Sequence, residues 1–198
     1  MGSGAAMHHT ETIPPLIPEH AMLSLDALTR AIPAPSFDEP LDMLYACHDK
    51  VRHFCEQLDA LPGYIAEHGH SHAVLNTIAG IVRYFEMAGP AHHQDEEQEL
   101  FPLIVARQPD AAAKIEQLLA EHGYLNARWR ALHDQLQAFG RGELVELDAA
   151  AIADFTRLYR EHAQREEDWL FPVAGQLIGE DELREAGQRM AARRTTSR

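Results

Sequence analysis

One short motif occurs twice in this chain and restricts the folds that it can adopt. Segment 92–102 aligns without a gap on segment 162–172, and the two segments share the pattern H-x-x-x-E-E-x-x-L-F-P together with the glutamine at 94 and 164. Residues four apart on an α-helix point in directions that differ by about 40°. His92 and Glu96 therefore share one helix face, and His162 and Glu166 share another. We expect a fold that packs these two faces against each other.

Apolar residues at helical spacing surround both motifs. They divide the chain after Pro40 into four amphipathic stripes with short connections between them. No segment alternates in the way that is typical of a β-strand, so the pattern predicts an all-α protein, an antiparallel up-down four-helix bundle. The predicted helices run from residue 41 to a stop at 61–63, from 75 to 103, from a cap at Asp110 to a stop at 140–142, and from a cap at Asp148 to 178.

Prolines mark the expected irregularities. Residues 1–40 hold six of the eleven prolines, which predicts a mostly irregular tail with a short helical turn near Leu23–Arg30. Gly89-Pro90 is expected to kink the second helix, and the two Leu-Phe-Pro triplets are expected to end or bend their helices. We predict that residues 41–178 form the bundle and that residues 179–198 form a short helix, Glu182–Arg193, and a tail.

Composition excludes several classes of partner. The formal net charge of −14 opposes binding to nucleic acid or to an anionic membrane surface. No apolar run approaches the ~20 residues that cross a bilayer, and the N-terminus does not resemble a secretory signal, so we expect a cytoplasmic protein. Cys47 and Cys55 lie on one predicted helix and cannot form a disulfide framework.

The repeat also identifies candidate metal ligands. One histidine lies in the apolar stripe before each motif, which extends the pattern to H…HxxxE…H…HxxxE. A bundle would bring these side chains together in its core, where unpaired carboxylates are costly unless cations neutralise them. Imidazoles and carboxylates without thiolates suit iron or manganese better than a structural zinc ion. We predict two metal ions bound by His48, His92, Glu96, His122, His162 and Glu166.

Two adjacent histidines compete for one place in this set. His92 aligns with His162, whereas His93 aligns with Ala163 and lies two turns after the charged Glu86. We therefore predict that His92 is the ligand and that His93 lies beside the buried stripe.

Three further residues are expected near the ligands. Glu97 and Glu167 follow the ligand carboxylates directly and are predicted to support the site from its rim. Tyr159 precedes His162 by one turn on the inner face. It either donates a hydrogen bond to an oxygen species at the metals or is an ordinary core tyrosine.

These residues resemble the hemerythrin-like (HHE cation-binding) family over about residues 41–178. The resemblance implies a di-iron centre in a four-helix bundle. Hemerythrin itself has a fifth histidine one turn after the third-helix ligand, where this chain has Asn126. The four-histidine, two-glutamate set is more similar to bacterial hemerythrin-like proteins and to di-iron proteins implicated in iron-centre repair. The repair proteins carry paired cysteines in an extra N-terminal domain, and residues 1–40 contain no cysteine.

The leading functional hypothesis is a non-haem di-iron protein that binds, senses or reacts with a small ligand such as O₂, peroxide or NO. The expected cofactor is two oxo- or hydroxo-bridged iron ions, with manganese or zinc as possible substitutes. The alternatives are a di-iron catalase or peroxidase, and a protein for iron storage, delivery or iron-centre repair. Oxygen release from peroxide tests the first alternative, and iron transfer to an apo-cluster protein tests the second.

Overall fold

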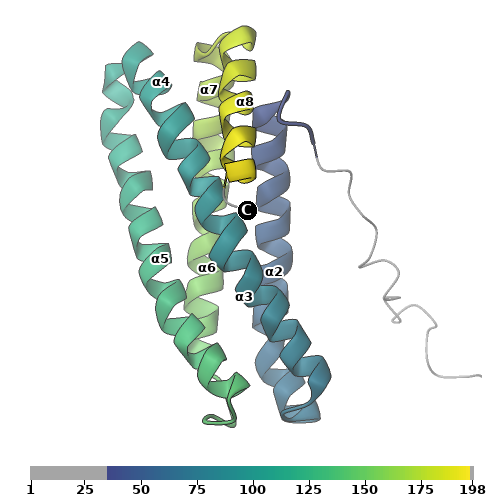
Figure 1. Cartoon of the computed structure of the whole chain (residues 1–198). Helices are drawn as coiled ribbons and strands as arrows, with labels where there is room; N and C mark the ends of the chain where they lie inside the picture. Colours follow the sequence, from purple (N-terminus) through teal and green to yellow (C-terminus); the bar gives the residue numbers. More distant parts are fainter. Residues whose placement is uncertain (1–34, 197–198) are drawn as a thin grey trace, which may run out of the picture. The chain divides into compact units, whose positions relative to one another are not determined.

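A computed structural model describes residues 35–196 of the chain, and every regular element in that range is helical. Long helical arms run up and down the bundle (Figure 1). The elements are α2 (Pro40–His68), α3 (His72–Asp95), η1 (Glu96–Leu100), α4 (Phe101–Arg107), η2 (Pro109–Ala111), α5 (Ala112–Gly140), α6 (Ala149–Arg165), η3 (Glu166–Leu170), α7 (Phe171–Leu177) and α8 (Glu180–Thr196). The predicted all-α four-helix bundle with an additional C-terminal helix is confirmed. The predicted turn at Leu23–Arg30 lies outside the described residues.

The bundle has four helical arms. The first arm is α2 and the third is α5, whereas the other two arms are not uninterrupted α-helices. The second arm consists of α3, η1 and α4, and the fourth consists of α6, η3 and α7. Both η1 and η3 are π-helical, and each begins at the glutamate of the repeated motif. Each Leu-Phe-Pro triplet begins at the last residue of such a segment, and its proline lies in the first turn of the next α-helix. Proline is tolerated there because the first turn has no intrahelical partner for its missing N–H. The triplets therefore do not end their arms.

The end of the first helix differs from the prediction. The first helix, α2, continues through Pro62 to His68 instead of stopping at 61–63. A proline inside a helix costs about 3 kcal/mol, and the burial of Leu58, Leu61 and Ile65 around it offsets that penalty. The second helix, α3, contains Gly89 and Pro90 as predicted, and the expected kink at these residues stays a prediction.

The predicted helix caps have different outcomes. Asp148 caps α6, because its Oδ1 accepts hydrogen bonds from the backbone N–H groups of Ala150 and Ala151. Asp110 does not cap α5. It lies inside the 3₁₀ turn η2, where the Ala111 N–H donates to the Gln108 carbonyl, and α5 continues directly from that turn.

A polar layer divides the core into two apolar clusters. One cluster includes Val51, Phe85, Leu125 and Phe155, and the other includes Leu44, Leu100, Leu118 and Leu170. On the first arm His48 lies between Leu44 and Val51, and on the third His122 lies between Leu118 and Leu125. The candidate ligands thus occupy a layer that is covered by hydrocarbon on both sides.

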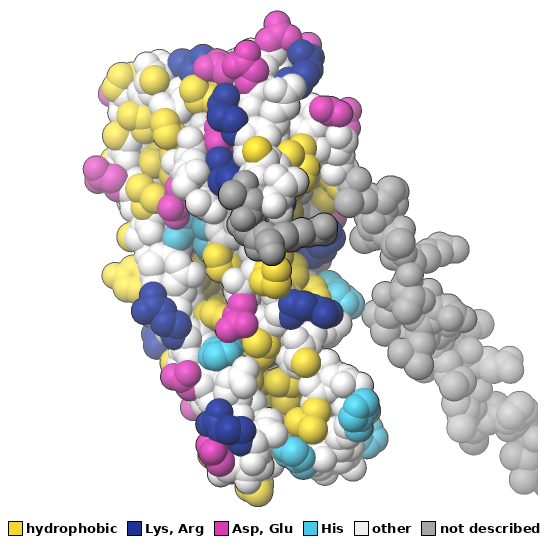
Figure 2. Space-filling model, viewed as in Figure 1, with side chains coloured by type: hydrophobic (Ala, Val, Ile, Leu, Met, Phe, Trp, Pro, Cys, Tyr) yellow, Lys and Arg dark blue, Asp and Glu magenta, His cyan; other side chains and the backbone are white. Residues whose placement is uncertain are grey.

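The C-terminal helix α8 packs across the second arm and is longer than the predicted Glu182–Arg193. Its Ala186 and Met190 are buried. Gly187 approaches the segment before α2 so closely that a Cβ there would come within 1.9 Å of the Phe37 carbonyl oxygen. Basic and acidic side chains lie next to one another over this helix (Figure 2).

Three arginines of α8 hold two buried carboxylates at the start of η1. Arg193 and Arg194 contact Asp95, and Arg189 and Arg193 contact Glu99. A buried carboxylate without partners would cost several kcal/mol, and these ion pairs remove that cost. Within residues 35–196, no helix combines the length and the apolar composition that crossing a bilayer demands.

Candidate metal centre

Glu166 lies at the meeting point of three histidines from different helices. Its Oε2 is 3.2 Å from His48 Nε2, and its Oε1 is 3.1 Å from His162 Nε2 and 3.5 Å from His122 Nε2. The carboxylate itself has no exposed surface. The two carboxylate oxygens of Glu166 therefore face imidazole nitrogens from α2, α5 and α6.

Glu96 occupies the matching place on the second arm. Its Oε1 is 3.3 Å from His92 Nε2, and its Oε2 is 3.6 Å from His122 Nε2. His92 Nε2 is also 2.9 Å from His48 Nε2. The structure thus brings together all six side chains predicted as ligands, and none of them is more than 2% exposed.

Many of the facing atoms lack a hydrogen bond among the described residues. Both oxygens of Glu96, Oε1 of Glu166, and Nε2 of His122 and His162 are buried without a hydrogen-bond partner. An unsatisfied buried polar atom costs about 1–3 kcal/mol, and more when it is charged. Lone pairs that face one another across a dry layer are stabilised by cations, so the residues present fit a metal site.

The geometry contains two groups that could each hold an ion. Within each group, one ligand atom from every residue lies within 4.8 Å of the others. The groups are His48, His92, Glu96 and Glu166, and His93, His122 and His162.

Two carboxylates on the outer side of the layer orient His48 and His122. His48 Nδ1 is 2.9 Å from Glu167 Oε1, and His122 Nδ1 is 2.6 Å from Glu97 Oε1. A neutral imidazole that donates Nδ1–H to a carboxylate presents a lone pair on Nε2, which is the nitrogen that faces the centre here. Glu97 and Glu167 therefore lie where the sequence predicted them. Arg52 Nη2 holds Glu167 at 2.7 Å.

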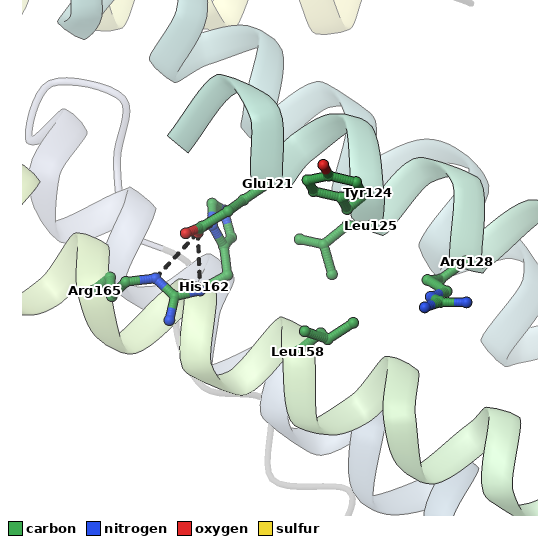
Figure 3. A pocket seen from close by; sticks show the side chains of 7 residues that line it. All are labelled: Glu121, Tyr124, Leu125, Arg128, Leu158, His162 and Arg165. Atoms are coloured by element: carbon green, nitrogen blue, oxygen red, sulfur yellow. Dashed lines mark hydrogen bonds and ion pairs between the residues drawn. The ribbon is translucent and has the colours of Figure 1, made fainter. Parts of the chain in front are cut away.

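The sequence analysis missed a third outer carboxylate, Glu121. Its Oε2 is 2.8 Å from His162 Nδ1, and Arg165 also donates to it (Figure 3). Glu121 stands directly before His122 and therefore shares its helix, but it serves the histidine of the neighbouring helix. It lines a pocket of about 250 Å³ between α5 and α6, together with Tyr124, Leu125, Arg128, Leu158, His162 and Arg165.

The π-helical turns lie where the ligand carboxylates are. In each turn the N–H of the residue after it donates five positions back, from Phe101 to the Glu96 carbonyl and from Phe171 to the Glu166 carbonyl. A π turn inserts an extra residue and rotates the following side chains relative to an α-helix. Glu96 and Glu166, which begin these turns, both point inward, and the next glutamate of each arm contacts a histidine of another helix.

Burial and charge perturb the titration of the metal-free layer. Burial raises the pKa of Glu96 well above its usual range, and the charge of Glu166 raises it further. Burial also raises the pKa of Glu166, but the charge of His162 and the close contacts with His48 and His122 outweigh it and hold that pKa well below normal. Burial lowers the pKa of His162, yet Glu166 and Glu121 reverse the shift and raise it to about 9. Burial lowers the pKa of His92 well below 6.5. In the absence of ions, a proton on His162 thus compensates the negative charges of Glu166 and Glu121.

The prediction for His93 was wrong, because this side chain lies inside the bundle. It is 4% exposed, and its ring stacks on His122 with a centroid distance of 3.8 Å and an interplanar angle of 8°. Ala163, its counterpart in the repeat, is also fully buried. An arm that packs between two neighbours buries both flanks of its inner face, so positions 92 and 93 are both covered.

Tyr159 also has a polar partner in the layer. Its hydroxyl is 3.2 Å from Nε2 of His93. Burial raises the pKa of Tyr159 well above 10, so the phenol remains protonated. The side chain is therefore more than apolar filling, and its hydroxyl is held by a histidine that contacts the candidate ligands.

Comparisons with known proteins agree with this arrangement. Residues 39–174 match the Hemerythrin HHE cation binding domain. A protein of Haemophilus influenzae, described only as an uncharacterized protein, is 40% identical over 159 residues, which cover 80% of this chain and 92% of that protein. The family match extends over most of the described bundle and includes both copies of the motif and both preceding histidines. The chain belongs to the hemerythrin HHE cation-binding domain family.

Proposed function

We propose that this chain is a non-haem di-iron protein that binds or reacts with a small ligand such as O₂, peroxide or NO. The observation that carries the proposal is the pair of fully buried carboxylates, Glu96 and Glu166, which face imidazole nitrogens from four helices. The family membership supports cation binding, and the absence of thiolates among the facing groups favours iron or manganese.

The donor count supports two ions with room for a ligand. Four histidines and two shared carboxylates would give each ion four protein donors. Iron prefers six donors, so positions would remain for a bridging oxygen and a small exogenous molecule. When bound, iron would supply reversible ligand binding or electron transfer.

The protein's own contribution is orientation and exclusion of water. Glu97, Glu121 and Glu167 hold three imidazoles with Nε2 toward the centre. The apolar clusters on both sides keep the layer dry, which strengthens electrostatic interactions within it. A small molecule of low polarity enters such a layer more easily than a large or highly charged one.

Metal analysis of protein purified without added metal tests the proposal. We expect about two iron ions per chain and, in air, near-ultraviolet absorption typical of an oxo-bridged di-ferric centre. Glu166→Gln removes a charge and one donor oxygen from the meeting point and should reduce the iron content to one ion or fewer. Glu161→Gln on the same arm alters only an exposed pair with Arg157 and should retain both ions. Uptake of a single zinc ion and no iron would refute the proposal.

A further inference from the structure

His93 and Tyr159 form a buried hydrogen-bonded pair beside the candidate ligands. One ring nitrogen of His93 lies within 4.8 Å of ligand atoms of His122 and His162. Nε2 of His93 is 3.2 Å from the Tyr159 hydroxyl, while its Nδ1 is buried without a hydrogen-bond partner among the described residues. The Tyr159 hydroxyl has no second partner there either. A buried imidazole nitrogen is thus left available next to the layer.

The ring geometry argues against His93 as another ligand of the ion bound by His122. The lone pair of an imidazole nitrogen lies in the plane of its ring. The rings of His93 and His122 are parallel to within 8° and stacked at 3.8 Å. Two such rings cannot direct in-plane lone pairs at one ion without rotating. His93 therefore contacts the site without joining its donor set.

Space for the Tyr159 hydroxyl is provided by a glycine at the equivalent position in the other half of the repeat. Tyr159 aligns with Gly89, and His93 aligns with Ala163. A Cβ on Gly89 would come within 3.0 Å of the Tyr159 hydroxyl oxygen. Glycine inside a helix costs about 1 kcal/mol relative to alanine, so the sequence tolerates a helix-weakening residue where the hydroxyl must fit. Two large polar residues thus stand where the other half of the repeat has two small ones.

We propose that His93 positions the small ligand of the metal centre. The Tyr159 hydroxyl donates to Nε2 of His93, which leaves the proton on Nδ1. That N–H donates a hydrogen bond to a small anion or oxygen-bearing molecule held beside His122 and His162. This role rests on the proposed function. Because His93, Tyr159, His122 and His162 are all buried, the site favours a small molecule that accepts hydrogen bonds.

Azide titration of the di-ferric protein tests this role. His93→Phe keeps a planar ring on His122 but removes the donor, and Tyr159→Phe removes the hydroxyl that holds the donor in place. Loss of one hydrogen bond should weaken azide binding by about 3- to 10-fold in each variant. Gly89→Ala should weaken it in the same direction by displacing the hydroxyl. Tyr84→Phe is the matched control. It removes a buried hydroxyl that donates to the Cys47 carbonyl, and azide affinity should not change.

Iron content is measured for every variant before azide is added. Retention of both ions with weaker azide binding supports the positioning role. Retention of both ions with unchanged affinity in His93→Phe and Tyr159→Phe overturns it and leaves the proposed function intact. A loss of iron in His93→Phe alone overturns it too, because His93 would then be a metal ligand. Absence of iron from the unmodified protein rejects the proposed function first, and this role with it. If His93→Phe does not fold, Tyr159→Phe and Gly89→Ala decide the question.

Discussion

Raising the pH of the metal-free protein should destabilise it, because the proton on His162 holds two carboxylates together. The imidazole lies 3.1 Å from Glu166 and 2.8 Å from Glu121. These contacts raise its pKa from 6.5 to about 9 against the opposing effect of burial. A group whose folded pKa is raised contributes its full stability below the unfolded pKa and loses it as the pH rises through the folded value. The difference between 6.5 and about 9 corresponds to about 3 kcal/mol. Glu96 changes stability in the same direction, since its pKa is raised as well.

Urea unfolding of chelator-treated protein measures this effect. The free energy of unfolding should fall by about 3 kcal/mol between pH ~6.5 and pH ~9.5. Glu121→Gln removes one of the carboxylates that retain the proton and should reduce the fall, whereas the exposed Glu161→Gln should not. Metal-loaded protein should lack the fall, because bound ions replace the proton. Equal unfolding free energies of the metal-free protein at the two pH values would refute the reasoning.

Two further predictions concern the groups around the centre. Glu167→Gln weakens the contact that orients His48, so the metal affinity measured by chelator competition should fall about 10- to 100-fold; an unchanged affinity would show that the outer carboxylate does not support the ligand. Replacing Arg193 and Arg194 by methionine leaves Asp95 buried with much less compensation, and we expect a loss of about 3–5 kcal/mol in urea unfolding. Arg157→Met on the surface should change stability by less than about 0.5 kcal/mol.

The bundle and the position of the polar layer could be predicted because both follow from one periodicity. Residues spaced by three and four share a helix face, and the repeat places one such face on each half of the chain. The structure accordingly brings His48 and His122 to the same layer as the two motifs. The ligand role of these side chains remains a prediction.

The π turns and the burial of His93 could not be predicted from the spacing of residues along the chain. A π turn uses the same residues as an α turn, so η1 and η3 were not predicted. The charged Glu86 on the same face indicates exposure of His93, but Gly89 lies one turn nearer to His93 and is buried, as His93 is. The repeat alignment pairs Gly89, which has no side chain, with Tyr159, which has a hydroxyl. This difference is a signal that could locate the face of α3 that carries His93.

The C-terminal helix shows the same limit. Its sequence predicts a polar helix, but no local pattern indicates that its arginines reach Asp95 and Glu99 on a distant segment. Long-range ion pairs depend on how elements pack, and spacing along the chain does not contain that information.

The two halves of the repeat place side chains of different size beside the candidate ligands, so the site is not symmetric. If every position of the motif were repeated, an entering molecule would meet the same surroundings from either side. Gly89 stands where the other half of the repeat has Tyr159, and Ala163 stands where it has His93, so the two halves are not equivalent. A diatomic molecule would therefore have one preferred orientation, with its hydrogen-bonding end toward the histidine, and the two halves of the repeat would make different contributions to its binding.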